Sequence, residues 1–252
     1  MNRATVAVFL LGFAVGLARA SAQARRVELD HVFIVVAPGA ASEIAALSSA
    51  GLTVLAQPTR HDGQGTASVA VLFANVYFEL IWIDSTVSVD PQHASTLEWF
   101  RKAAAWRSSG RSPFGLGLRR LPGDTAALTV PVKREPATWL GPGAAYELLH
   151  QPADSLAADF FVVPAQAALP TWIGRARQRD PASLRHPGGG REVTLVRVHG
   201  AAGHVPAAFQ VLMPMPVEFV RASSPLLEIR LDGGTEGNRV DMRPILPLVL
   251  VR

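Results

Sequence analysis

The chain contains no cysteine among its 252 residues. Disulfide bonds, a lipid-modified cysteine and catalysis by a thiol are therefore excluded. Charged residues are also scarce, at 17%, whereas 49% of the residues are hydrophobic. This balance is typical of a chain that buries a substantial core, in one large domain or two small ones.

Long apolar runs are absent after the N-terminal segment, where residues 4–17 form an apolar run behind an early arginine. Small residues then offer signal peptidase three cleavage frames, which end at Ala20, Ala22 and Ala24. The pattern predicts a secretory signal peptide over residues 1–24, and hence a periplasmic or secreted bacterial protein with no membrane attachment after cleavage. An uncleaved membrane anchor is the alternative, although the run is shorter than the roughly 20 residues that a span needs.

Charge of one sign is not strongly in excess. The formal net charge of +4 falls to +2 when Arg3 and Arg19 leave with the signal peptide, because 22 Lys and Arg then face 20 Asp and Glu. A nucleic-acid partner is not expected, since no recognition module or interleaved aromatic pattern is present. One arginine-rich segment is interpreted as a solvated surface, with an anionic ligand as the alternative; its members are Arg175, Arg177, Arg179, Arg185 and Arg191.

Residues 27–85 combine strand and helix signals in one compact unit. The opening stretch "VELDHVFIVV" is apolar and β-branched, as in a strand buried on both faces, and "AASEIAALSSAGL" has helical spacing. The predicted order is strand, helix, strand, strand, strand, over residues 27–36, 40–52, 53–56, 69–74 and 76–83, with "RHDGQGTAS" as a polar loop.

A helical linker over residues 86–112 follows, in which Leu97, Phe100 and Ala104 share one face. The pattern then begins again over residues 113–168, which we interpret as a second, degenerate module. Its predicted elements are strands at 114–120, 137–141, 144–151 and 159–165 and a helical turn at 123–131. Residues 169–252 are predicted to form a β-rich extension, with strands at 191–200, 225–234 and 246–252.

We single out two ionisable residues in the strands of the first module. Glu79 is the only charge in "VYFELIWI", and His31 lies in the opening strand. A buried carboxylate is costly unless it is protonated, paired or bound to a metal. Imidazole and carboxylate on adjacent strands can form a divalent metal site or an acid–base pair. The alternative is a structural pair, because two side chains do not by themselves fix a metal.

Other polar residues offer weaker signals. The loop "HDGQGT" contains His61, Gln64 and Thr66 next to two glycines that allow a tight turn. Glu147 and Glu228 lie in apolar strands and are candidates for a further ligand. The remaining histidines are interpreted as surface or loop residues, namely His93, His150, His199 and His204, and "RHPGGG" as a turn that leads into a strand.

Four of these stretches, "LDHVFIVV", the helix ending in "GL", "HDGQGT" and "ANVYFELIWID", together resemble the glyoxalase-like subgroup of the vicinal oxygen chelate superfamily (glyoxalase, bleomycin resistance and dioxygenase proteins). The resemblance covers residues 27–84. The stretch "RHPGGGREVTLVRV", residues 185–198, is similar to a His-Pro-Asn-Gly segment that often follows the core in that subgroup. Residues 114–165 fit only as a diverged second module.

The resemblance implies an α+β fold in which paired β-α-β-β-β modules form a curled mixed sheet around a cleft. It implies that His31 and Glu79 hold a divalent metal (Zn, Mn, Fe or Ni), that Glu79 or His61 moves a proton, and that Gln64 and Thr66 contact the substrate. The second module departs from the pattern, because it offers Gly115, Leu116 and Gly117 in place of a histidine and Phe160 and Phe161 in place of a carboxylate.

The expected function is therefore that of an exported glyoxalase-like protein that binds a small organic molecule in a cleft. Lyase, isomerase or dioxygenase-type chemistry would follow if a metal is held. The alternative is a metal-free protein that binds or sequesters a small molecule on the same fold. The depleted second module favours this alternative, whereas His31 and Glu79 favour the enzyme. A homodimer is compatible with either.

Overall fold

The computed structural model describes residues 27–125, 127–128, 130–149, 158–201, 217–234 and 238–252. The predicted signal peptide, His150 and His204 lie outside these residues. The described chain is mixed α+β, with one sheet of eight strands and one of five. The predicted class, a curled mixed sheet with a β-rich C-terminal part, is confirmed. Within the described residues, no helix is long and apolar enough to cross a membrane.

The first module contains one strand, one helix and three strands, in the predicted order. These elements are β1 (Val27–Val35), α1 (Ala41–Ser49), β2 (Thr59–His61), β3 (Thr66–Leu72) and β4 (Tyr77–Ile83). The strand predicted over residues 53–56 is wrong, and β2 lies partly in the stretch predicted as a polar loop. Gly63 and Gly65 adopt positive φ and turn the chain so that β2 pairs with β3 at the edge of the sheet, where polar side chains are tolerated.

The second module consists of strands only, over the residues that the structure describes. They are β5 (Phe114–Arg120), β6 (Val132–Pro136), β7 (Ala145–Leu149) and β8 (Asp159–Val162). The helical turn predicted at 123–131 is not formed by the described residues of that segment. The strand predicted at 137–141 is also wrong, because Thr138–Leu140 forms the short 3₁₀ helix η2. The strand is β6, a mostly exposed edge strand whose charged residues hide it from the hydrophobic pattern.

The two modules meet at the centre of the eight-stranded sheet, whose order is β2-β3-β4-β1-β5-β8-β7-β6. In each module the opening and closing strands are parallel neighbours, β1 with β4 and β5 with β8. β1 and β5 pair antiparallel and join the modules. The sheet curls strongly, so it has a concave and a convex face.

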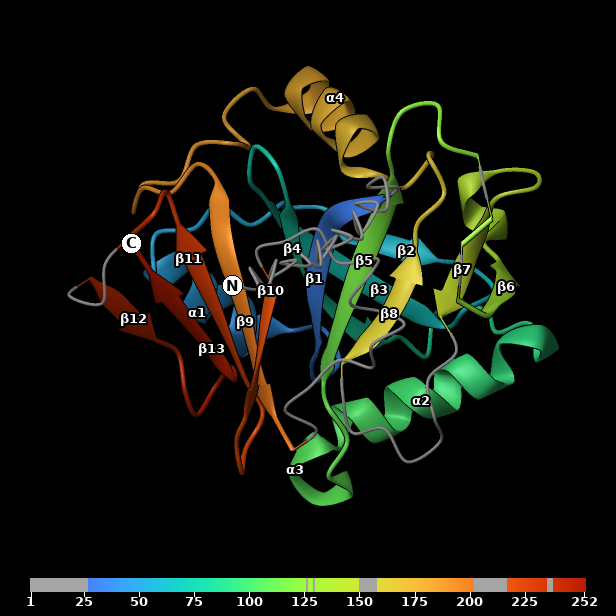
Figure 1. The fold of residues 1–252 in the computed structure, drawn as a ribbon, viewed down its shortest axis with the longest axis horizontal. Coiled ribbons are helices and arrows are strands. Elements are labelled where there is room, and N and C mark those ends of the chain that lie inside the picture. Colours follow the sequence, from blue (N-terminus) through green and yellow to red (C-terminus); the bar gives the residue numbers. More distant parts are fainter. Residues whose placement is uncertain (1–26, 126, 129, 150–157, 202–216, 235–237) are drawn as a thin grey trace, which may run out of the picture.

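The C-terminal strands form the second sheet, in the order β10-β9-β11-β13-β12. They are β9 (Val193–Gly200), β10 (Val217–Arg221), β11 (Leu226–Leu231), β12 (Arg239–Asp241) and β13 (Leu248–Val251). Figure 1 shows this orange-to-red sheet as a layer beside the blue-to-yellow strands of the larger sheet. The main hydrophobic core joins residues of the two sheets, such as Val32 and Ile34 of β1 with Val196 and Leu227.

Alternate residues of β1 therefore face two different environments. Val32 and Ile34 belong to the core between the sheets, whereas Phe33 and Val35 belong to a second cluster on the concave face. Both faces are buried, which is why the strand reads as a continuous apolar run.

Two longer helices cover the concave face. The 3₁₀ helix η1 (Pro91–His93) leads into α2 (Ala94–Ala104) and α3 (Trp106–Ser109), as predicted for the linker, although Ala103 rather than Ala104 joins Leu97 and Phe100 on the buried face. The unpredicted helix α4 (Leu169–Arg179) packs on Ala70, Leu72 and Tyr77. In Figure 1, α4 lies at the top of the view and α2 at the bottom.

Candidate functional site

A cavity of about 310 Å³ opens on the concave face of the larger sheet. His31 and Phe33 of β1 and Tyr77 and Glu79 of β4 line it. The parallel register pairs His31 with Tyr77 and Phe33 with Glu79, so these four side chains project from one face of two neighbouring strands.

His31 and Glu79 are close to each other inside this cavity. The Nε2 atom of His31 lies 3.8 Å from Oε2 of Glu79, and the two residues are 3% and 9% exposed. The imidazole stacks on the ring of Tyr77, with 4.3 Å between the ring centroids, and meets Phe161 edge-on. The ring is therefore held between two aromatic side chains while one nitrogen faces Glu79.

Asp30 holds the other nitrogen of the same ring, which the sequence did not predict. Its Oδ1 lies 3.0 Å from His31 Nδ1, and the residue is fully buried. Neighbouring residues of a strand normally point to opposite faces. Here the pairing of β1 with β5 shifts register between Leu29 and His31, and the resulting bulge lets two successive side chains meet.

Burial raises the pKa of Glu79 above its usual value. The charge of His31 and a hydrogen bond from Ser68 oppose this effect, and the carboxylate of Asp30 adds to it. A carboxyl with a raised pKa holds a proton more readily than an ordinary carboxylate, which makes Glu79 a candidate for general acid–base catalysis.

A second histidine joins the same polar group through hydroxyl side chains. His61 Nδ1 lies 2.8 Å from Thr66 Oγ1, and that hydroxyl donates to Gln64 Oε1 at 2.7 Å. Thr66 must therefore accept from His61 Nδ1, which leaves Nε2 without a proton. Burial, followed by the charge of His31, lowers the pKa of His61 to about 4.

Ser68 lies between this histidine and Glu79. Its hydroxyl donates to the Glu79 carboxyl and lies 3.4 Å from His61 Nε2, and its single proton can serve only one of these two acceptors at a time. We call His31, Glu79 and His61, which line the cavity, the polar floor of the cavity. Of the residues that the sequence singled out, His31, His61, Gln64 and Glu79 line the cavity, and Thr66 lies beneath them with no exposed surface.

Aromatic side chains from several elements surround the polar floor. We call them the aromatic wall; its members are Phe33, Trp99, Trp139, Tyr146, Phe161 and Trp172. Trp139 of η2 lies 5.4 Å from His61 and 6.0 Å from Tyr146, between ring centroids. The chain has two tyrosines, and both Tyr77 and Tyr146 line the cavity. Burial raises the pKa of both, so their hydroxyls remain donors at neutral pH.

Further ionisable residues line the cavity away from the polar floor. Glu135 of β6 is 2% exposed and accepts a hydrogen bond from Thr96 of α2 at 2.6 Å, with Lys133 at 3.5 Å. Burial raises the pKa of Asp159 to about 7, although the charge of Arg111 opposes this. The cavity therefore offers charged groups at two separate places.

The two donors expected for a metal ion, His31 and Glu79, are adjacent and fit part of a metal site. A carboxylate behind a metal-binding histidine, as Asp30 lies behind His31, is also typical of such sites. Over the described residues, no group of three or more His, Asp or Glu side chains is arranged to hold a metal ion. Gly117 and Phe161 of the second module lie beside His31 and add no donor.

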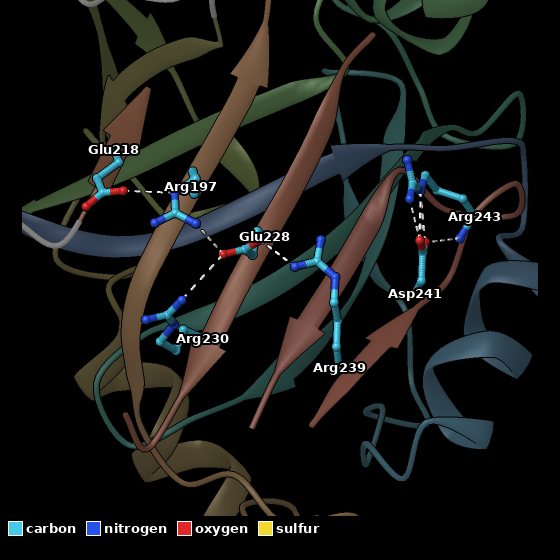
Figure 2. A network of polar contacts seen from close by, with 7 residues as sticks. All are labelled: Arg197, Glu218, Glu228, Arg230, Arg239, Asp241 and Arg243. Carbon is cyan, nitrogen blue, oxygen red and sulfur yellow. Dashed lines mark hydrogen bonds and ion pairs between the residues drawn. The ribbon is translucent and has the colours of Figure 1, made fainter. Parts of the chain in front are cut away.

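Several weaker predictions are corrected by the structure. Glu147 is not in the cavity lining and pairs with Arg120 at 2.6 Å. Glu228 lies in the other sheet, where Arg197 and Arg239 bind its two oxygens at 2.7 and 3.1 Å (Figure 2). Both carboxylates are thus engaged in ion pairs rather than available to a metal at this site.

His93, predicted at the surface, has no exposed area. Its ring nitrogens bond to the backbone oxygens of Gly63 and Pro136, at 2.7 and 2.9 Å. It therefore ties the loop after β2 to the end of β6. His186 of the "RHPGGG" turn has a similar role, because Thr53 N–H donates to its Nδ1 and its Nε2 bonds to Leu72 O.

Sequence reasoning missed Asp30, Ser68 and most of the aromatic wall. The contact of Asp30 with His31 depends on a bulge in β1 that the residue pattern does not predict. The wall residues of α4 had a detectable signal, because Leu169, Trp172, Ile173 and Ala176 have helical spacing.

No protein-family model and no curated protein matches the sequence. Among solved structures, the crystal structure of a hypothetical protein from Staphylococcus aureus is similar, with a TM-score of 0.52 over 89% of this chain and 97% of that chain. The two sequences are 9% identical. At this identity the similarity shows a shared fold, and function must be argued from the site.

Proposed function

We propose that the protein binds a small aromatic molecule in the cavity, with a polar group of that molecule turned toward the polar floor. The observation that carries this proposal is the make-up of the lining, which combines the rings of the aromatic wall with three ionisable side chains, His31, Glu79 and His61. Ligand pockets in proteins combine apolar and aromatic walls with polar groups that fix orientation, and this cavity offers both, with polar or charged side chains at about half of its lining positions.

The aromatic wall favours a planar ligand. Trp139, Tyr146 and Phe161 come from three elements of the second module. The ring centroids of Trp139 and Tyr146, and those of Tyr146 and Phe161, lie no more than 6.0 Å apart. Each aromatic contact adds about 0.5–1.5 kcal/mol beyond the burial of area. The second module, which lacks the residues expected to bind a metal, thus supplies much of the apolar surface that would contact the bound molecule.

We further propose that the chain is a glyoxalase-like member of the vicinal oxygen chelate superfamily. Support comes from the paired modules of the curled sheet and from the parallel strands β1 and β4, which present His31 and Glu79 to the cavity. The proposal predicts that the ligand meets the first module with its polar end and the second with its apolar body.

A catalytic role is the second candidate, and the placement of His31 between Asp30 and Glu79 favours it. His31 and Glu79 would hold a divalent ion, with water or ligand oxygens completing its coordination. Such an ion would polarise a ligand oxygen. Glu79 would then move a proton, and the Ser68 hydroxyl lies between it and His61.

Titration calorimetry with 2-naphthol tests the binding proposal, with naphthalene and cyclohexanol as probes that lack the hydroxyl or the aromatic ring. We expect 2-naphthol to bind with a Kd of roughly 10–100 µM, as a ligand of this size allows. The Trp139→Ala variant should weaken binding at least tenfold. Trp106→Ala is the matched control, because Trp106 of α3 does not line the cavity.

Two results would count against the binding proposal. One is a Kd above about 1 mM for all three probes with the folded protein. The other is an equal loss of affinity in Trp139→Ala and Trp106→Ala, which would show that the cavity is not where the probe binds.

Elemental analysis of the purified protein tests the catalytic candidate, after reconstitution with Mn, Fe, Ni and Zn. Stoichiometric metal in the wild type that is lost in His31→Ala supports it. His186→Ala serves as the control, since His186 is a buried histidine outside the cavity. The absence of bound metal from the reconstituted wild type would rule out the metal-dependent form of this candidate.

We also propose that the protein is exported after cleavage of its signal peptide. The sequence of residues 1–24 suits cleavage after Ala20, Ala22 or Ala24. Mass spectrometry of the protein from the periplasm or medium of an expressing bacterium should give a mass that begins at Ser21, Gln23 or Arg25. A full-length chain in the membrane fraction would instead support the uncleaved anchor.

A further inference from the structure

We infer that Asp30 is the positioning residue of this site, and that it acts by keeping a proton on Nδ1 of His31 so that Nε2 faces Glu79. This inference rests on the proposed function, because it concerns the residue that the ligand would meet. Asp30 itself does not line the cavity. It would therefore act through His31 rather than by touching the ligand.

Asp30 and His31 form a close contact in the interior of the protein. Asp30 Oδ1 lies 3.0 Å from His31 Nδ1, and both residues are almost completely buried, at 0% and 3% exposed. The bulge in β1 forms this contact between successive residues. A carboxylate has only acceptor sites, so the hydrogen bond requires a proton on Nδ1.

The other oxygen of Asp30 is also held by hydrogen-bond donors. Oδ2 accepts the backbone N–H of Leu169 at 2.8 Å and lies 3.4 Å from Nη1 of Arg119. Arg119 is held in place by Glu28, at 2.7 Å from its Nε, and by the backbone oxygen of Asn75 at 3.2 Å. Every neighbour of Oδ2 is thus a donor, and Asp30 cannot rotate without losing two partners.

The Asp30 carboxylate is also connected to the wall of the cavity through α4. Leu169 is the first residue of α4, where a negative charge is favoured by the helix dipole. The same helix carries Trp172, whose ring lies 6.2 Å from that of Tyr77, and Tyr77 stacks on His31. One carboxylate therefore sets the orientation of the imidazole and anchors the helix that covers it.

The Asp30→Asn variant separates positioning from a purely structural role. Leu169 N–H and Arg119 both require an acceptor, so the amide oxygen of Asn should remain with them. The amide NH₂ would then face His31 Nδ1, which must become an acceptor, and the imidazole proton should move to Nε2. A structural role alone would not change the tautomer.

The test is ¹⁵N NMR of the histidine side chains in the full folded chain at one fixed pH, without ligand. The chain has seven histidines, and His31→Gln identifies the resonances of His31. We expect Nδ1 of His31 to bear a proton in the wild type and to have lost it in Asp30→Asn. Glu28→Gln is the control, because it removes the other acidic partner of Arg119 but leaves the partner of His31 unchanged.

A wild-type His31 whose Nδ1 bears no proton would overturn the inference, and this measurement needs no variant of Asp30 to fold. An unchanged Nδ1–H in folded Asp30→Asn would overturn it as well. Because the readout is independent of 2-naphthol, failure of the probe to bind would refute the proposed function without altering this result.

Discussion

The imidazole of His31 lies directly over the backbone of Gly117, its partner on β5. A Cβ atom on Gly117 would lie 2.2 Å from Cε1 of that ring, closer than any real contact allows. The same relationship holds for Gly115, the next residue of β5 on the same face, where a Cβ would lie 2.1 Å from the ring of Phe33. Gly115 and Gly117 of the second module thus make room for side chains of the first.

Gly117→Ala should therefore disturb the site while leaving the strand pairing possible. We expect the free energy of unfolding to fall by about 1–3 kcal/mol, as for other overpacked cores. The affinity for 2-naphthol should fall with it, because His31 must move. Chemical denaturation and calorimetry measure the two effects.

Gly174→Ala is the matched control for this substitution. Gly174 lies in α4, has open space where a Cβ would be, and is exposed. Alanine should raise the free energy of unfolding by up to about 1 kcal/mol, because glycine weakens a helix. Equal stability changes in the two variants would contradict the steric account of Gly117.

The low pKa of His61 predicts an acid-sensitive fold. The pKa falls from 6.5 to about 4 on burial, so the unfolded chain binds a proton between these values that the folded chain does not. The contribution of His61 to the free energy of unfolding is fully present above about pH 6.5. It is lost as the pH falls toward 4, which lowers the free energy of unfolding by about 3 kcal/mol. The His61→Gln variant should lose this part of the pH dependence.

The comparison must be made between variants, since Glu79 acts in the opposite direction. Its raised pKa means that protonation favours the folded chain as the pH falls. The free energy of unfolding should be measured by denaturation for wild type and His61→Gln, each at pH 7 and pH 4. The difference between the two proteins removes the contribution of Glu79 that they share. Parallel pH profiles for the two proteins would refute the assignment to His61.

Asp159 should show the reverse behaviour. Burial raises its pKa to about 7, so the ionised form is disfavoured in the folded chain and stability declines as the pH rises from about 4 to 7. Asp159→Asn should be more stable than the wild type at pH 8, by about 2 kcal/mol, and should lose this advantage near pH 4. A loss of stability at both pH values would show that the ionised carboxylate is needed.

Glu228 is expected to stabilise the second sheet. Its side chain is 4% exposed and lies among Arg197, Arg230 and Arg239 (Figure 2). Glu228→Ala should cost about 3 kcal/mol, because arginines are left without their buried partner. Glu218→Ala removes an exposed partner of the same Arg197 and should cost less than about 1 kcal/mol. Similar losses in both variants would contradict this difference.

The sequence allowed His31 and Glu79 to lie close together, because two strands buried on both faces can be neighbours in one sheet, and the family resemblance implied that the opening and closing strands both face the cleft. It could not predict the partners of either residue. Asp30 reaches His31 through a bulge, and Ser68 reaches Glu79 from a third strand. His93 was wrongly predicted at the surface because the backbone oxygens that bond to its ring belong to residues 30 and 43 positions away in the sequence.

The elements that were misplaced share a physical reason. β2 and β6 are edge strands, where alternation of apolar residues is not required, and their polar residues resemble a loop. β1 and β4 were predicted well because burial on both faces leaves a continuous apolar signal. The aromatic wall was harder to foresee, since its rings come from α2, η2, α4 and several strands that only the curled sheet brings together.

The most direct test of the central claim is a crystal of the protein soaked with 6-bromo-2-naphthol, with the bromine located by its anomalous scattering. We predict one bromine inside the cavity against the aromatic wall, near Trp139 and Phe161, with the hydroxyl of the probe closer to Glu79 than the bromine is. A bromine bound only outside the cavity, for example at Trp106, would contradict the account.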